Sequence, residues 1–377
     1  MCGIICLAIY GTGVGVSQSL MSLGGTLFAF WGIAFLWPNL SKKSKLSNLA
    51  LSSVLLITFL STGVLARNQD RVFTRALELI PLFFVPLGIL VLHRQLDEFH
   101  KQLASKVLNR ITMLSVSVSC LYAIYQFLFL KVPGIAFFRN PIYLAYSLLP
   151  IFLVFLWKIY QPRSDTARLQ SFFVFLVFLG LIATQNRVTP IVAILSVAFL
   201  EIRKIRAERK FSLKKYLLAM FIGVTFLGSG LALNPALKEK LSRPMGLQDP
   251  STSARMTVWK ENYKIFMQNP IAGVGFLKNG IDTAERTEYQ NHWTPGTLIY
   301  AHSVYLQILA EGGILGFFLL GFWLYSLMKI DQAIVFVTVS FFLIAGITEN
   351  ITVNSKPFHA FLFAIGAINF LIPSEQS

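Results

Sequence analysis

The sequence is poor in charged residues and in cysteine. Charged residues make up 13% of its 377 residues, hydrophobic residues make up 55%, and the mean hydropathy is +0.64. Soluble domains carry roughly 25% charged residues, so this composition excludes an ordinary soluble protein. The three cysteines, Cys2, Cys6 and Cys120, lie in apolar runs and lack the paired spacing of a disulfide framework or a metal site. The composition therefore predicts a polytopic membrane protein.

Other signals are also absent. No motif of roughly 20–50 residues recurs, which excludes a solenoid. Nowhere do two aspartates flank a single residue, the usual metal–nucleotide handle of soluble sugar transferases, and this argues against a nucleotide-sugar donor. Gly11, Gly13 and Gly15 lie in an apolar run with no preceding strand, so they favour helix packing over phosphate binding. Because no charged leader or small-residue cleavage site stands out, we expect Gly3–Val16 to be a first membrane segment and not a removable signal peptide.

Long apolar runs dominate the rest of the chain. Twelve of them are long enough, or nearly long enough, to cross a membrane. They cover residues 2–16, 20–37, 48–65, 76–92, 111–131, 143–160, 170–186, 187–202, 213–233, 302–328, 331–348 and 356–372. We therefore expect an all-α polytopic membrane protein with about twelve transmembrane helices. Helices one to nine occupy residues 1–233, a large loop containing an amphipathic helix occupies 234–301, and helices ten to twelve occupy 302–377.

The basic residues predict an orientation for these helices. With the N-terminus inside, the cytoplasmic connections hold 18 lysines and arginines, and the short outer connections hold 7. The positive-inside rule then places both ends in the cytoplasm and the 234–301 loop outside. Much of the net charge of +16 is thus explained by topology and does not indicate nucleic-acid binding.

The polar loop turns back into an apolar run between Tyr300 and Phe318, where several polar residues cluster. His302 stands at the water-facing mouth of the predicted helix. A histidine in the first turn feels the positive end of the helix dipole, which favours the neutral imidazole that accepts a proton; an interfacial anchor is the alternative. Gln307 and Glu311 lie four residues apart, and therefore on one face, deeper than lipid normally tolerates. Three glycines flatten the surface beside Glu311 and would let a neighbouring helix satisfy it: Gly312, Gly313 and Gly316.

The outward-facing arginines are a minority against the positive-inside bias. Arg187 sits in a turn between two apolar runs that is too short to lift it far above the membrane. A fixed cation there requires an anion, either a lipid phosphate or a phosphorylated substrate. For the arginines of another outer turn, Arg67, Arg71 and Arg75, contact with lipid headgroups is favoured.

The large loop contains a predicted helix that starts at Pro250–Ser253 and stops at Asn269–Pro270. Its apolar residues repeat at three and four residues, which indicates an amphipathic helix lying on the bundle or membrane: Met256, Trp259, Tyr263 and Phe266. Arg255 falls in its first turn, and with the helix N-terminus it would form an anion site; solvent exposure with no role is the alternative. The nearest approach to an outer metal site, Asp282, Glu285 and Glu288, is typical of a solvated helix face.

These motifs together resemble a known family. His302 to Gly316, His-Ser-Val-Tyr-Leu-Gln-Ile-Leu-Ala-Glu-Gly-Gly-Ile-Leu-Gly, looks like the signature of the O-antigen ligase and polymerase superfamily, in which a His-Asn-x-Tyr-Leu-Gln-type run ends a large periplasmic loop. Ser251 to Phe276 is similar to the family's Ser-x-Arg-x-x-x-Trp and Pro-Leu-x-Gly-Val-Gly pattern, and Arg187 falls at its outer-hairpin arginine. The motifs cover roughly residues 184–317, while Ser303 stands where asparagine is usual.

The resemblance implies an O-antigen ligase of the bacterial inner membrane, multi-pass and with its active site facing the periplasm. It would be an inverting glycosyltransferase of lipopolysaccharide biosynthesis that needs no metal, nucleotide or other cofactor. The donor glycan would be carried on undecaprenyl pyrophosphate and the acceptor hydroxyl on lipid A–core, with membrane lipids around and no nucleic acid. His302 would be the catalytic base, and Arg187, Arg255 and Arg243 would bind the pyrophosphate. The supporting residues would be Gln307, Glu311 and Trp259.

Two other functions compete with the ligase. A polymerase of the same superfamily would use a second lipid-linked glycan as acceptor. A lipid or solute transporter would place ionisable residues at the membrane midplane within paired, broken halves, but Glu311 is the only acid well inside a predicted span and no halves correspond. The single compact loop suits a lid over a laterally open cavity better than a channel for a growing chain, and this favours the ligase.

Overall fold

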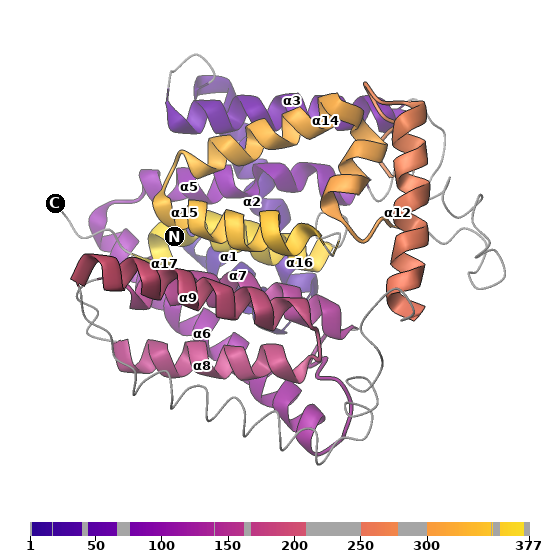
Figure 1. Ribbon diagram of the computed structural model, residues 1–377. Helices are drawn as coiled ribbons and strands as arrows, with labels where there is room; N and C mark the ends of the chain where they lie inside the picture. The colour runs from indigo at the N-terminus through magenta and orange to yellow at the C-terminus, as the bar shows by residue number, and fades with distance from the viewer. Residues whose placement is uncertain are drawn as a thin grey trace. The chain divides into compact units, whose positions relative to one another are not determined.

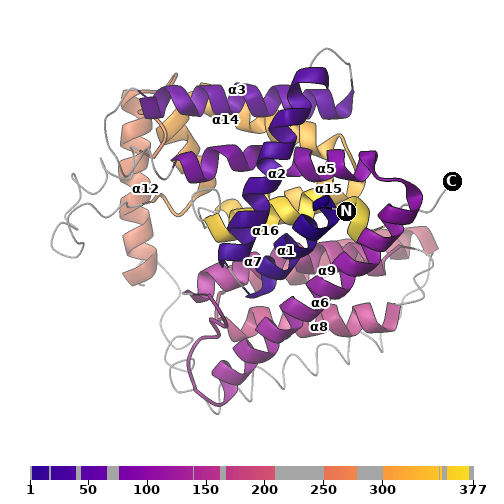
Figure 2. The same ribbon diagram turned by 180° about the vertical axis from the view of Figure 1, so that it is seen from behind.

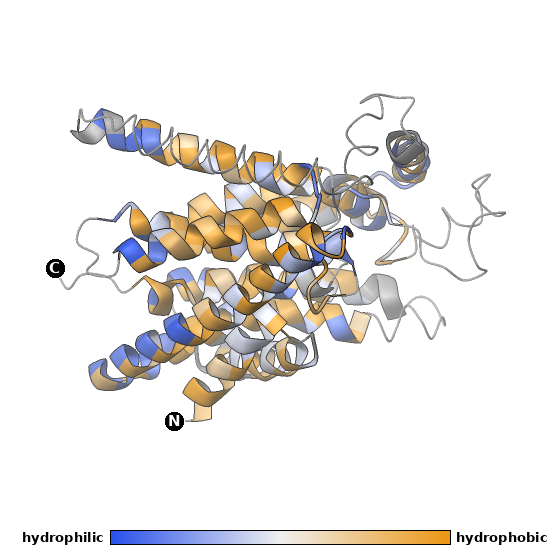
Figure 3. Cartoon of the chain, turned by 90° about the horizontal axis from the view of Figure 1, so that it is seen from below, coloured by the Kyte–Doolittle hydropathy of each residue, from blue (hydrophilic) through white to orange (hydrophobic). Residues whose placement is uncertain are grey.

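The computed structural model describes ten stretches of the chain, and every regular element within them is a helix (Figures 1 and 2). The described residues are 2–16, 18–39, 44–65, 76–138, 140–161, 167–208, 250–277, 300–347, 349 and 355–372. Four helical segments among them are long and apolar enough to cross a membrane, namely Ala76–Gln95, Glu98–Leu128, Pro141–Ile159 and Val304–Met328. Hydrophobic residues cover most of the helical surface, and hydrophilic residues gather towards helix ends (Figure 3). The all-α membrane architecture is confirmed, while twelve spans and an outer loop remain predictions.

The elements run in chain order as α1 (Cys2–Val16), α2 (Gln18–Asn39), α3 (Lys45–Leu65), η1 (Ile80–Phe84), α5 (Val85–Gln95), α6 (Glu98–Leu128), α7 (Pro141–Ile159), α8 (Ala167–Ala183), α9 (Val188–Glu208), α12 (Pro250–Gln268), α14 (Val304–Met328), α15 (Gln332–Val337), η3 (Thr338–Ile344), η4 (Ala345–Ile347), α16 (Ser355–Gly366) and α17 (Ile368–Leu371). Most predicted apolar runs correspond to one of these helices. The run at 331–348 is instead divided into an α-helical, a π-helical and a 3₁₀ piece.

Helix α6 starts earlier than its apolar run because it has a strong N-cap. The side chain of Asp97 accepts a hydrogen bond from the backbone N–H of His100 at 2.8 Å, and this bond lowers the pKa of the Asp97 carboxyl. The helix therefore begins at Glu98, within the polar connection that precedes the run at residue 111. Polar residues at one end of a long helix are expected where the helix leaves the membrane.

One compact unit comprises Met1–Gly24, His93–Arg243 and His359–Ser377. Helix α7 forms its core, with every residue from Leu144 to Trp157 buried, and α8 and α9 both pack against it. Helix α1 packs closely along α6, where the hydroxyls of Ser115 and Ser119 donate to the carbonyls of Gly11 and Gly15. The glycine run therefore serves helix packing, as its apolar setting predicts.

The second compact unit comprises Gly25–Leu92 and Pro244–Phe358. Its longest helix, α14, packs along α3, and the indole N–H of Trp323 donates to the hydroxyl of Ser53 at 3.1 Å. The faces of Gly312 and Gly316 lie against the ring of Phe59 on α3, so these two glycines do admit a neighbouring helix. This unit holds most of the residues for which a function is predicted.

Helix α12 has the predicted length, and the face that it buries within the protein lies beside the predicted apolar stripe. It spans Pro250–Gln268 and packs against α14. Val258, Asn262 and Ile265 are buried, whereas Tyr263 is 54% exposed. The stripe that includes Tyr263 was predicted to lie on the bundle or on the membrane, and the residues that α12 buries within the protein lie one position away from it and include a polar residue. The amide of Asn262 is satisfied within the helix by the carbonyl of Val258 at 2.9 Å.

Candidate functional site

The candidate site lies where α14 begins, and α14 is not one continuous helix. Gly313 has φ 60° and ψ −158°, which breaks the helix after its first residues, Val304–Gly312 (Figure 1). An α-helix broken in this way leaves carbonyl and N–H groups without intrahelical partners. The residues Val304–Gly312, which carry Gln307 and Glu311, therefore form a separate segment before the long apolar part of the helix. Both side chains were predicted to lie deep within one continuous span, and the break corrects that prediction.

The segment Pro270–Leu277 supplies the missing backbone partners. The N–H groups of Val274 and Gly275 donate to the carbonyls of Ala310 and Glu311 at 2.9 and 2.8 Å, and the N–H of Ile314 donates to the carbonyl of Pro270 at 2.8 Å. A Cβ atom on Gly273 would overlap the backbone of Glu311, and one on Gly313 would overlap the carbonyl of Ile271. The glycines of the two motifs are therefore required because two backbones touch there.

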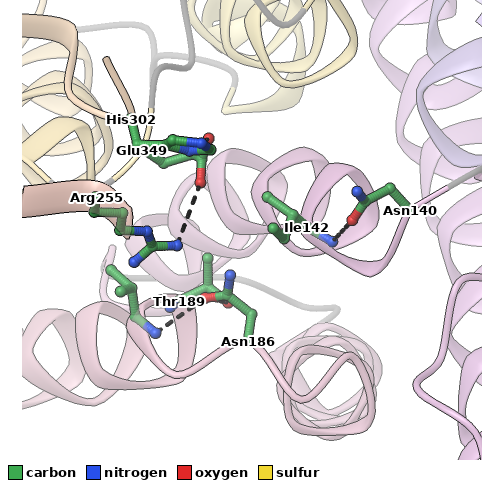
Figure 4. Close-up of polar contacts among 8 residues, drawn as sticks. Asn140, Ile142, Asn186, Thr189, Arg255, His302 and Glu349 are labelled. Carbon is green, nitrogen blue, oxygen red and sulfur yellow. Dashed lines mark hydrogen bonds and ion pairs between the residues drawn. The ribbon is translucent and has the colours of Figure 1, made fainter. Parts of the chain in front are cut away.

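His302 precedes this broken helix and does not lie in its first turn. Ser303 occupies the N-cap position, so His302 is one residue outside the helix, with φ 48°. The helix-dipole argument for its first-turn position therefore does not apply. Its side chain is 39% exposed, and its Nδ1 lies 3.3 Å from Oε1 of Glu349 (Figure 4). The carboxylate, and not the dipole, is what faces the imidazole.

Glu349 was not singled out from the sequence. Its side chain is only 5% exposed, and it lies two positions after the end of the 3₁₀ piece η4. The predicted topology holds a signal for this residue, because it places Glu349 on the outer side of the membrane. Glu349 follows the apolar run 331–348, which the predicted topology directs outward, so it falls on the same side as His302. Only the basic residues were assigned to sides in predicting the topology, and this acid was missed.

Arg255 approaches the same carboxylate from α12. Its Nη2 lies 4.0 Å from Oε2 of Glu349, at the outer limit of an ion pair, and its side chain is 33% exposed (Figure 4). The structure therefore brings together His302 and Arg255, which the sequence predicted, through Glu349, which it did not. Since a guanidinium carries five N–H donors, this one loose contact leaves others for an anion.

The contact with Glu349 bears on the roles of the ring nitrogens of His302. A carboxylate in its charged form accepts hydrogen bonds only, so opposite such a carboxylate Nδ1 is the nitrogen that donates. The neutral imidazole then has an unprotonated Nε2, which accepts a proton from a neighbouring hydroxyl. A carboxylate behind the imidazole also stabilises the imidazolium that results. A histidine oriented by a carboxylate in this way has the geometry that general-base chemistry requires.

Tyr305 forms hydrogen bonds to the helical segment that precedes Glu349 in the chain. Its hydroxyl lies 2.6 Å from the carbonyl of Leu343 and 3.3 Å from that of Phe342, to which it donates. Both carbonyls belong to the π-helix η3, which comes before η4 in the run that leads to Glu349. Single π-helical turns occur frequently at functional sites. The tyrosine of the His302 motif therefore links the start of α14 to η3.

Gln307 and Glu311 form a buried pair on one face of α14, as their spacing predicts. The amide of Gln307 donates to Oε1 of Glu311, and the same oxygen accepts from the backbone N–H of Leu277 at 2.9 Å. Oε1 of Gln307 accepts from the N–H of Ala301 at 2.9 Å. In these contacts the pair binds itself and two loop residues, whereas a neighbouring helix was predicted to satisfy Glu311.

Arg187 belongs to the other compact unit, the one that contains α8 and α9. It lies in the predicted short turn, between α8 and α9. The hydroxyl of Thr184 accepts from the N–H of Asn186 at 3.2 Å, and Oδ1 of Asn186 accepts from the N–H groups of Val188 and Thr189 at 2.9 and 3.0 Å (Figure 4). These bonds hold Arg187 directly at the N-terminus of α9.

The remaining predicted residues have simpler outcomes. Trp259 lies one turn after Arg255 on α12, and its indole N–H is buried with no hydrogen-bond partner among the described residues. Arg243 lies outside the described residues, as do the arginines 67, 71 and 75 and the acidic residues Asp282, Glu285 and Glu288. Within the described stretches, no three His, Cys, Asp or Glu side chains are grouped so as to hold a metal ion.

Comparison with known proteins adds to this geometry. No curated protein matches the chain. A family model described as O-antigen ligase matches residues 172–321, which include Arg187, Arg255 and His302 together with α12 and most of α14. This family covers ligases and polymerases that act on glycans. This match, and the site that its motif residues form at the broken start of α14, support a protein of the O-antigen ligase family.

Proposed function

We propose that the chain is an O-antigen ligase. It transfers a glycan from undecaprenyl pyrophosphate to a hydroxyl of the lipid A–core oligosaccharide at the periplasmic face of the bacterial inner membrane. The observation that carries the proposal is the contact of 3.3 Å between Nδ1 of His302 and Glu349, in a chain whose family acts on lipid-linked glycans. This contact supports the proposal that His302 is the general base that takes the proton from the acceptor hydroxyl.

The reaction is a single displacement at the anomeric carbon. Nε2 of His302 takes the proton from the acceptor hydroxyl, and the oxygen of that hydroxyl forms the new glycosidic bond. The bond between the anomeric carbon and the pyrophosphate oxygen breaks, and undecaprenyl pyrophosphate leaves with the electron pair. Glu349 stabilises the imidazolium that forms. One displacement from the opposite face inverts the anomeric carbon.

The leaving pyrophosphate gains negative charge, and arginines offset it. Arg255 is half-exposed beside Glu349, with guanidinium donors beyond its one loose ion pair. Arg187 at the N-terminus of α9 and Arg243 in the large loop complete the proposed set. Arginine forks bind phosphate oxygens bidentately, so a fixed set of them stabilises this charge without a metal ion.

The alternative is a polymerase in which a second lipid-linked glycan is the acceptor. The base and the arginines serve both reactions equally. A ligase has to admit a bulky core oligosaccharide anchored in the same leaflet, and α12 lies beside α14 with Tyr263 and Met267 exposed along one side, 54% and 56%. A helix with exposed apolar residues suits the surface of a membrane that delivers a lipid-anchored acceptor.

The test is glycan transfer by the purified full-length chain in lipid nanodiscs. His302→Ala should lower the rate by ~10²–10⁴ because it removes the general base. Expression and thermal unfolding should stay like those of the wild type, because the side chain is 39% exposed. Excess chelator should leave the wild-type rate unchanged. Wild-type activity in His302→Ala would contradict the assignment of the base, and activity lost in chelator and restored by a divalent ion would contradict the metal-independent reaction.

A further inference from the structure

Gln307 and Glu311 are buried polar residues that the proposed reaction does not use. They are 0% and 1% exposed, and the described contacts of their side chains do not include the imidazole of His302. Burying a glutamine and a glutamate beside each other costs free energy unless their polar atoms are bonded. The pair therefore requires an explanation in terms of what it holds in place.

The pair binds backbone N–H groups from two separate segments of the chain. Through Gln307 Oε1 it binds the N–H of Ala301 at 2.9 Å, directly before His302. Through Glu311 Oε1 it binds the N–H of Leu277 at 2.9 Å, at the end of the segment that fills the break in α14. The bond between the two side chains links these contacts into one chain from Leu277 to Ala301. Two distant stretches of the loop are thus fixed to one face of the same helix.

Both stretches carry an unfavourable backbone conformation at the point of contact. Leu277 has φ 61° and His302 has φ 48°, and neither residue is glycine. A residue other than glycine is strained in this left-handed region and persists there only where its surroundings determine it. The contacts of Gln307 and Glu311 fall on Leu277 itself and on the residue next to His302. They are the constraints that keep these conformations.

We infer that Gln307 and Glu311 are positioning residues for the general base. Resting on the proposed function, the inference is that Gln307 sets the backbone of His302 through Ala301, while Glu311 orients the Gln307 amide and anchors it to Leu277. The imidazole then meets Glu349 with Nε2 directed to the acceptor. The contacts that carry this role are to backbone and to each other, so the two are positioning residues and not catalytic residues.

This role requires hydrogen-bond acceptors at fixed places. A carboxylate charge at Glu311 is not required, because Oε1 makes both of its contacts and the side-chain oxygen of glutamine makes the same two. Glu311→Gln therefore keeps the positioning, whereas Glu311→Ala and Gln307→Ala remove it. A displacement of about 1 Å at a reacting group costs on the order of 10²-fold in rate, so the two alanine variants should lose about that much in kcat.

The experiment measures kcat and KM for donor and acceptor with the purified chain in nanodiscs. Glu311→Ala and Gln307→Ala should lower kcat on the order of 10²-fold with KM nearly unchanged, and Glu311→Gln should recover most of that loss. The matched control is Gln126→Ala in the other compact unit. Gln126 is also buried, and its Oε1 accepts from the N–H groups of Ile135 and Ala136 at 2.9 and 2.8 Å. Thermal unfolding should fall in all alanine variants, but kcat should fall only in the Gln307 and Glu311 variants.

A second arm joins Glu311→Ala to His302→Ala. If Glu311 acts through His302, the double variant should be no slower than His302→Ala alone. The inference would be overturned if Glu311→Ala lowered kcat by the same factor in the wild-type chain and in His302→Ala. It would also be overturned if kcat in Glu311→Ala stayed at the wild-type value or fell only as much as in Gln126→Ala. A folded Glu311→Gln variant as slow as Glu311→Ala would overturn it as well. The proposed function fails separately, when His302→Ala transfers glycan at the wild-type rate.

Discussion

At the scale of single residues, Glu349 has the central position in the site. Its two carboxylate oxygens face different partners, Oε1 towards His302 at 3.3 Å and Oε2 towards Arg255 at 4.0 Å. Replacing the carboxylate by an amide keeps the shape and an acceptor for Nδ1, but it removes the charge that stabilises the imidazolium. The charge and the shape of this residue are therefore separable by mutation.

Glu349→Gln should lower kcat on the order of 10²-fold, because a base loses effectiveness when its protonated form is not stabilised. Glu349→Asp keeps the charge on a shorter side chain, so its kcat should lie between those of the wild type and of Glu349→Gln. Steady-state transfer rates measure this, with Glu201→Gln as control because Glu201 accepts from Tyr160 in the other unit. A Glu349→Gln enzyme as fast as the control would mean that the carboxylate is only structural.

The arginines make a second residue-scale prediction. Arg187→Ala and Arg255→Ala should each lower transfer on the order of 10²-fold by removing stabilisation of the leaving pyrophosphate. Lysine should restore activity only in part, because a point charge does not reproduce the bidentate guanidinium fork. Arg71→Ala, in a predicted headgroup contact, should matter less. Equal losses in all three alanine variants would contradict a specific pyrophosphate site.

His302 and Arg255 were predictable from the sequence because each belongs to a short motif with a fixed spacing. Glu349 was not, because it lies 47 residues beyond His302 at the end of an apolar run. Nothing local distinguishes it from an acid that ends a membrane helix. The position of His302 outside the first turn was also missed, since helix ends depend on backbone angles that a sequence pattern does not specify.

At the scale of elements, the break in α14 joins two motifs. Hydrophobic periodicity continues across Gly313, so the sequence predicted one helix and assigned its glycines to helix packing. Gly312 and Gly316 do pack against Phe59, but Gly313 has a backbone conformation that a helix does not allow. The Pro270–Leu277 motif follows from this break, since it supplies the hydrogen bonds that the broken helix lacks.

Gly313→Ala and Gly273→Ala should therefore both lower the unfolding temperature and abolish transfer. Each has positive φ, and each added methyl group would overlap backbone of the other motif. The control is Gly321→Ala in the same helix, where no heavy atom lies within 4 Å of the added Cβ. In a regular helix this change stabilises by up to about 1 kcal/mol. Thermal unfolding in detergent measures all three, and equal unfolding temperatures would show that the junction tolerates a side chain.

At the scale of the whole molecule, apolar runs predicted the helical membrane class but not the assembly. The two compact units draw their segments from separate parts of the chain, so that α1 packs on α6 and the hydroxyl of Tyr10 donates to the carbonyl of His359 at 2.9 Å. Local periodicity carries no information on such distant pairings. Cap residues likewise lengthened α6 beyond its apolar run.

The choice between ligase and polymerase also belongs to the whole molecule, because the site residues serve both. What differs is the acceptor: lipid A–core for the ligase, and a second lipid-linked glycan for the polymerase. A strain lacking this protein should therefore make lipid A–core without attached O-antigen and accumulate polymerised glycan on undecaprenyl pyrophosphate, as seen on lipopolysaccharide gels and in the extracted lipid-linked pool. The wild-type chain should restore the ladder and the His302→Ala chain should not. Core capped with a single repeat unit would instead identify a polymerase, because ligation would then proceed without chain growth.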